Sequence, residues 1–157
     1  MFSLKLSNIK VLSFLILILC LVSIGNDISF INKIFWATLI GASFFLLQFN
    51  FKFKNLLIGC YGLLGIYIQL RINQYVFSEE FFLNCLAVLL IAKYSEILTK
   101  NNQLSFCLIS MVVAVASLIK GQDLFSSATA FTIIILSIIN MYLVQQKEVM
   151  DFNFKNI

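Results

Sequence analysis

Long apolar runs alternate with short polar breaks along most of this 157-residue chain. The runs are continuous and lack the alternation of apolar and polar residues that marks the strands of membrane barrels. Their lengths approach the roughly 20 apolar residues that a helix needs to cross a bilayer. We therefore predict an all-α, polytopic membrane protein built as a bundle of about six transmembrane helices. The predicted spans are residues 9–24, 31–49, 56–70, 81–98, 104–119 and 124–144.

The polar breaks between the runs are too short to hold a further domain. We therefore predict a single integral membrane domain over residues 1–157, with a polar tail at residues 145–157. Helices that are joined by short loops pack as antiparallel neighbours, so we expect a compact bundle.

The composition supports the same class of protein. Hydrophobic residues make up 61% of the chain and charged residues only 11%, whereas a typical soluble domain is about 25% charged. The net charge of +4 is small and spread along the chain, without the basic helix or aromatic-lined groove of a nucleic-acid surface. We predict that the chain is surrounded by a lipid bilayer and does not bind nucleic acid.

The positions of the basic residues predict the orientation of the bundle. With six spans and the N-terminus in the cytoplasm, the segments on the inner side hold more lysine and arginine than those on the outer side, as cytoplasmic loops usually do. This pattern predicts that both termini are cytoplasmic. The inner residues are Lys5, Lys10, Lys52, Lys54, Lys93, Lys100, Lys147 and Lys155, and the outer ones are Lys33, Arg71 and Lys120.

Residues that commonly carry catalysis or bind metals are sparse. Histidine is absent, and the four cysteines each lie alone in a different apolar run, without a C-x-x-C pair. We therefore predict no catalytic, metal or cofactor site, and we do not expect an enzyme. We expect Cys20, Cys60, Cys85 and Cys107 to be buried free thiols that pack as small apolar residues.

One pair of opposite charges lies near the end of the fourth run. Lys93 and Glu96 are three residues apart, so on a helix they share a face and can pair. A charged residue at the bilayer centre costs about 2.5–3.5 kcal/mol and is a functional candidate. Lys93 is close enough to the end of its run for its ammonium to reach the headgroups. From the residues alone, a structural ion pair at the cytoplasmic interface is the favoured interpretation, and a functional pair is the alternative.

The sequence around this pair resembles a bacterial membrane-protein family. Residues 92–96 (AKYSE) are followed by a polar turn, an apolar run and Gln122 at the next break. This order is similar to the N-terminal membrane domain, of unknown function, of the transglutaminase-like integral membrane proteins. In that family a Lys-x-x-Glu ends a helix and a glutamine precedes the next helix but one. The resemblance implies that Lys93, Glu96 and Gln122 form a polar cluster in a bacterial inner membrane.

The resemblance is incomplete in two respects. The family has an Arg-Asp pair in the turn after the Lys-x-x-Glu, where this chain has Asn101 and Asn102. Relatives usually continue with a periplasmic transglutaminase-like domain that has a Cys-His-Asp triad, and a chain without histidine cannot form that triad. We expect either a stand-alone membrane module or the remnant of a split or decayed gene.

Two functions follow from these observations. The favoured one is a non-enzymatic accessory or scaffold subunit that associates with a transglutaminase-like or envelope-assembly partner. The alternative is a small homo-oligomeric transporter or channel, although the chain shows neither an internal repeat nor a proline-broken helix.

Small and polar residues inside the runs predict how the helices pack. Gly59, Gly62 and Gly65 repeat every three residues and allow helices to approach closely. Trp36, near the start of its run, is typical of an anchor at the membrane interface. Four amides lie within or near the spans and are expected to form hydrogen bonds between helices. They are Gln48, Gln69, Asn84 and Asn140.

Overall fold

The computed structural model describes the backbone of residues 2–25, 30–48, 54–72, 78–97, 100–120 and 123–155. It describes side chains within residues 9–25, 30–45, 56–71, 78–97, 101–120 and 123–146. These residues form six helices and contain no strand, which confirms the predicted all-α class. The helices are α1 (Phe2–Gly25), α2 (Phe30–Gln48), α3 (Lys54–Ile72), α4 (Glu79–Ser95), α5 (Lys100–Lys120) and α6 (Leu124–Lys155).

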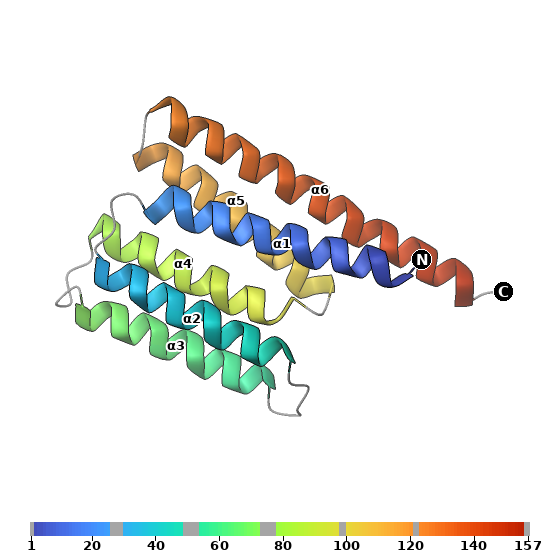
Figure 1. The fold of residues 1–157 in the computed structure, drawn as a ribbon, viewed down its shortest axis with the longest axis horizontal. Helices are drawn as coiled ribbons and strands as arrows, with labels where there is room; N and C mark the ends of the chain where they lie inside the picture. The colour runs from blue at the N-terminus through green and yellow to red at the C-terminus, as the bar shows by residue number, and fades with distance from the viewer. Residues whose placement is uncertain are drawn as a thin grey trace.

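The helices lie side by side in one bundle, and each runs in the opposite direction to the helix before it (Figure 1). Helix α4 lies in the middle, where it packs against α1, α2, α3 and α5. Helix α6 packs against α5 and α1 on one side of the bundle, and α3 packs chiefly against α4 on the other. Because α4 has neighbours on several sides, most of its residues are buried.

Four helices end within two residues of the predicted positions, whereas α4 and α6 end further from them. Helix α4 ends at Ser95 rather than residue 98, because Glu96 leaves the helical conformation. The Glu96 N–H donates to the Lys93 carbonyl, and the Ile97 N–H donates to the Tyr94 carbonyl. Helix α6 continues through the predicted polar tail to Lys155. That tail contains no glycine or proline to stop the helix. Polarity therefore marks where the apolar surface ends, not where the helix ends.

The core combines aliphatic packing with an aromatic cluster. Ile16, Leu90 and Phe106 are fully buried where α1, α4 and α5 meet. The ring of Tyr94 lies 5.9 Å from that of Phe44 and 6.0 Å from that of Phe106, measured between centroids. Since these rings come from α2, α4 and α5, they hold three helices together at one end of the bundle.

The surface is more apolar than that of an ordinary soluble bundle. Each of the six helices exposes at least one large apolar side chain by more than half: Val11, Phe30, Leu63, Phe82, Leu108 and Phe131 are examples, one from each helix. Among the described residues, Asn101–Lys120 and Leu124–Gln146 are long and apolar enough to cross a membrane. Shorter apolar segments are Ile9–Gly25, Phe30–Phe45 and Leu56–Arg71. Length and composition therefore support a membrane location through two helices.

Side-chain caps fix the start of two helices. The N–H of Phe81 donates to the Ser78 hydroxyl oxygen over 3.2 Å at the start of α4. At α6 the N–H of Ser126 donates to the Asp123 carboxylate over 3.3 Å. Hydrogen bonding to Ser126 lowers the pKa of that carboxyl. Both caps satisfy N–H groups that have no carbonyl partner in the first turn.

We expect Ser78→Ala to lower the free energy of unfolding by about 1 kcal/mol, because the first turn of α4 loses its cap. The measurement is reversible unfolding of the purified chain in mixed micelles. Ser105→Ala is the control, since the Ser105 hydroxyl donates only to the Asn101 carbonyl of its own helix. Equal losses in the two variants would contradict a capping role for Ser78.

Candidate functional site

Lys93 and Glu96 form the ion pair that their spacing predicts. The Lys93 Nζ lies 2.5 Å from the Glu96 Oε2, and the two side chains are 35% and 14% exposed. The pair lies where α4 ends, and the Asn102 side-chain amide donates to the Glu96 carbonyl over 3.2 Å. Asn102 ties the first turn of α5 to the end of α4 without adding a charge.

The third predicted member of the cluster, Gln122, lies outside the described residues. Its described neighbours in sequence, Lys120 and Asp123, lie at the other end of the bundle from Glu96 (Figure 1). The 21 residues of α5 lie between the two ends, which corresponds to about 30 Å of helix. Of the three predicted residues, the structure therefore places only Lys93 and Glu96 together.

The ion pair closes one end of an apolar groove between α3 and α4. The groove has a volume of about 200 Å³. We call it the α3–α4 groove, and its lining includes Gly59, Gly62, Leu63, Leu89, Lys93 and Glu96. The groove exists because glycine leaves space on α3: a Cβ atom added at Gly59 would have no neighbour within 4 Å. This combination can bind an apolar segment that carries a polar group at one end.

A buried polar cluster that the sequence analysis missed joins α1, α5 and α6. The Asn140 side-chain amide donates to the Ser13 hydroxyl over 2.9 Å and to the Cys107 sulfur over 3.4 Å. One turn away, the Ser110 and Ser137 hydroxyls are 2.7 Å apart. All five residues are fully buried. We call them the α1–α5–α6 polar cluster, and their mutual hydrogen bonds hold three helices in register.

The predicted role of the amides is therefore found at Asn140, which connects three helices. Asn84 and Gln69 are also fully buried, on α4 and α3. The side-chain atoms of Asn84 have no hydrogen-bond partner among the described residues. The side chain of Gln48 lies outside the described residues.

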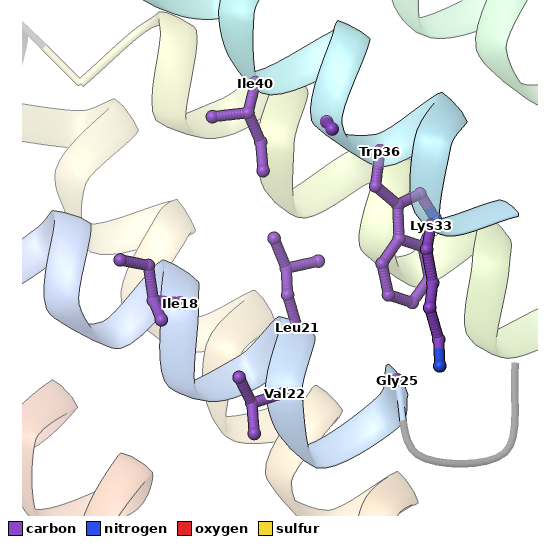
Figure 2. Close-up of a pocket in the computed structure, with 8 residues that line it drawn as sticks. Ile18, Leu21, Val22, Gly25, Lys33, Trp36 and Ile40 are labelled. Atoms are coloured by element: carbon purple, nitrogen blue, oxygen red, sulfur yellow. The ribbon is translucent and has the colours of Figure 1, made fainter. Parts of the chain in front are cut away.

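A larger groove of about 400 Å³ separates α1 from α2 (Figure 2). Its walls are apolar, with Ile18 and Val22 on α1 and Ile40 on α2, and Lys33 is the one charged side chain among the described residues that line it. The Trp36 ring lines the same groove yet is only 4% exposed, because it packs against Gly25 at the end of α1. Trp36 is thus a packing residue and not the exposed interfacial anchor that its position in sequence suggests.

The cysteines only partly match the expectation of buried thiols. All four are free. Cys20 and Cys107 are buried, Cys85 is partly buried, and Cys60 is exposed on α3. Cys60 differs because it lies on a part of α3 that the other described helices do not cover. Among the described residues, no group of three histidine, cysteine, aspartate or glutamate side chains is placed to hold a metal ion.

No protein-family model, curated protein or solved structure matches this chain. The resemblance to the membrane domain of the transglutaminase-like proteins therefore remains a prediction from residues 92–96 and Gln122.

Proposed function

We propose that this chain is a non-enzymatic, six-span module of the bacterial inner membrane that binds a transmembrane helix of a partner protein in the α3–α4 groove. The observation that carries the proposal is the groove itself, which has glycines on one wall and the Lys93–Glu96 ion pair at one end. It lies beside α3, which packs chiefly against α4.

The distribution of side chains supports membrane embedding of all six helices. Large apolar residues are exposed on every helix, whereas the interior holds several polar ones. A water-soluble bundle of this size would cover that apolar surface or use it for binding. Lipid covers it without further protein. The buried polar residues are Ser13, Asn32, Ser43, Gln69, Asn84, Ser95, Gln103, Ser110, Ser117, Ser137 and Asn140.

The groove has the features by which one membrane helix recognises another. Small residues let the backbones approach closely, which lipid-embedded helices use because they gain little from burying apolar surface. A Cβ atom at Gly59 would have no neighbour within 4 Å, so a helix in the surrounding lipid can approach the α3 backbone closely there. The ion pair adds a polar contact at one end, where a polar side chain of the partner helix would replace headgroup or water. The two features together set both the depth and the direction of the bound helix.

The identity of the partner rests on the family resemblance. We propose a protein that carries a transglutaminase-like domain, or another protein of envelope assembly, and we place both termini of this chain in the cytoplasm. The chemistry then belongs to the partner, and this chain holds it in the membrane.

We expect Gly59→Leu to reduce the yield of the complex at least tenfold, because its Cβ atom has no neighbour within 4 Å and the rest of the side chain occupies the groove. The measurement is the amount of a transglutaminase-like protein that is co-purified with the tagged chain from its native membrane in mild detergent. Gly41→Leu is the matched control: Gly41 is also an exposed helical glycine with no neighbour within 4 Å, but it lies on α2. Equal yields from the two variants would refute docking in this groove.

Glu96→Gln tests the polar end of the groove separately. The variant keeps the size of the side chain and removes its charge, so Lys93 loses its ionic partner. We expect a severalfold lower yield of the same complex with little change in melting temperature, since Lys93 is exposed enough to be solvated. An unchanged yield would remove the ion pair from the recognition site.

The alternative function, a small homo-oligomeric transporter or channel, has one observation in its favour: polar residues do converge inside the bundle. In the α1–α5–α6 polar cluster, however, these groups are fully buried and bonded to each other. This favours a packing role there. Purification of a homo-oligomer without a partner would favour transport instead, and solute flux into proteoliposomes would then be the next measurement.

A further inference from the structure

A column of polar side chains lies between α2 and α4, apart from the α3–α4 groove and the α1–α5–α6 polar cluster; one of its members, Trp36, also lines the α1–α2 groove. The Asn32 side-chain amide donates to the Glu80 Oε1 over 3.2 Å and joins the first turns of the two helices. Trp36 and Asn84 each follow four residues later on the same helix, hence on the same face and one turn deeper. The two helices are parallel, since Phe44 and Tyr94, near their other ends, are also in contact. We call Asn32, Trp36, Glu80 and Asn84 the α2–α4 polar column.

The deeper atoms of this column are buried without partners. Asn32, Trp36 and Asn84 are 1%, 4% and 0% exposed. The Asn32 Oδ1, the Trp36 Nε1 and both polar atoms of the Asn84 side chain have no hydrogen-bond partner among the described residues. A buried polar group that loses its bonds to water and gains none from protein is strongly destabilising, so native structures rarely leave one unsatisfied. Here four such atoms belong to one column.

A third helix adds to the polarity around Asn84. On α3, Gly65 faces Val88 of α4, and Gly62 faces Ala92. The same antiparallel register places Gln69 opposite Asn84. Gln69 is fully buried as well. The polar environment therefore extends across α2, α3 and α4 at the end of the bundle where Glu80 lies.

The mixture of donors and acceptors identifies the occupant. The Trp36 Nε1 and the Asn84 Nδ2 can only donate, whereas the Asn32 Oδ1 and the Asn84 Oδ1 can only accept. A metal cation would leave the donors unsatisfied, and an anion would leave the acceptors unsatisfied. Water both donates and accepts, and buried water usually bonds such groups. Glu80 is partly exposed, which gives the column a polar connection to the end of the bundle.

We propose that ordered water molecules occupy the α2–α4 polar column and bond Asn32, Trp36 and Asn84, so that this end of the bundle is hydrated. The contrasting case is the α1–α5–α6 polar cluster, where the Asn140 Nδ2 donates to both Ser13 and Cys107 and the Oδ1 is the one side-chain atom of Asn140 without a partner among the described residues. The proposal does not depend on partner binding, because the atoms are buried by the chain itself.

Trp36 is the only tryptophan of the chain, so its indole N–H is a single reporter that needs no substitution. The experiment uses the full-length chain, labelled with ¹⁵N-indole tryptophan, in lipid bilayers, and measures transfer of water magnetisation to the indole signal by solid-state NMR. We expect rapid transfer, although the ring is almost fully buried. The Asn140 amide nitrogen, which donates to Ser13 and Cys107, is the protein-bonded reference, in a second sample labelled with ¹⁵N-asparagine and assigned by Asn140→Asp. Transfer to the indole as slow as to Asn140 would overturn the proposal.

Asn84→Leu distinguishes water in the column from water that enters by the α1–α2 groove on the other side of the ring. Leucine has nearly the same size but removes the bridging amide, so we expect the rapid transfer to Trp36 to fall severalfold. Transfer that persists unchanged would mean that the water does not lie in the column.

We also expect Asn84→Leu to lower the melting temperature by several degrees, because the water molecules in the column lose their hydrogen bonds to the Asn84 amide. A rise would show that Asn84 is dry and unpaired in the native protein. Asn84→Ser, which keeps a hydroxyl, should retain the transfer and serves if the leucine variant does not fold.

Discussion

Asn140→Ala is expected to lower the free energy of unfolding by about 2–3 kcal/mol. Asn140 lies at the centre of the α1–α5–α6 polar cluster, and its amide donates to the Ser13 hydroxyl and the Cys107 sulfur. The variant loses both hydrogen bonds and leaves a cavity in a fully buried site. The measurement is reversible unfolding in mixed micelles with increasing denaturing detergent.

The matched control is Thr132→Ala on the exposed side of the same helix. The Thr132 hydroxyl donates only to the Ala128 carbonyl of α6, so its removal should change stability by less than about 0.5 kcal/mol. A double variant, Ser13→Ala with Asn140→Ala, should lose less than the sum of the two single variants, because both remove the same hydrogen bond. Strictly additive losses would show that the two residues do not interact in the native bundle.

The α1–α5–α6 polar cluster also shows why the sequence could not predict this part of the interior. Serine is common inside membrane helices, and Ser13, Ser110 and Ser137 each lie between two apolar residues in sequence. Nothing near them in sequence indicates a partner, because the partners lie on other helices. The cluster depends on which helices are neighbours and on their register. Both are set by packing over the whole bundle and not by local pattern.

The helices themselves were predictable because a continuous apolar run has few alternatives to a helix. The pairing of Lys93 with Glu96 was predictable for a related reason, since a spacing of three residues decides contact within one helix. The ends were less predictable. Helix α4 ends where Glu96 turns the backbone, and α6 continues past its apolar part. Both boundaries depend on backbone hydrogen bonding, which hydropathy does not report.

Trp36 and Asn32 show a further limit of sequence analysis. A tryptophan near the start of an apolar run suits the membrane interface, but here Gly25 leaves room for the ring to pack between α1 and α2. Asn32 lies one turn away, where an amide suggests a helix end exposed to solvent. The structure buries it against Glu80. In both cases a residue from another helix decides the environment, and only the folded arrangement shows it.

Gly65→Leu is the second change with a large expected effect, a loss of about 3 kcal/mol in the free energy of unfolding. Gly65 is buried where α3 crosses α4, and a Cβ atom there would lie 2.7 Å from the Val88 Cγ1. Val88 is fully buried and β-branched, so it has few other rotamers. Helix α3 must move away from α4 to accept any side chain. Gly41→Leu is the control, since a Cβ atom at Gly41 has no neighbour within 4 Å and stability should be unchanged or slightly higher.

A compensating change tests whether Val88 is the cause of that loss. Gly65→Ala introduces only the Cβ atom, and we expect it to destabilise the chain by about 1–2 kcal/mol, less than leucine does. Adding Val88→Ala removes the two methyl groups that the new atom meets, so the double variant should recover part of the loss even though Val88→Ala alone leaves a cavity. Recovery would show that the close approach of α3 to α4 depends on a glycine opposite Val88. If the double variant loses more free energy of unfolding than the two single variants together, the strain lies elsewhere in the α3–α4 contact.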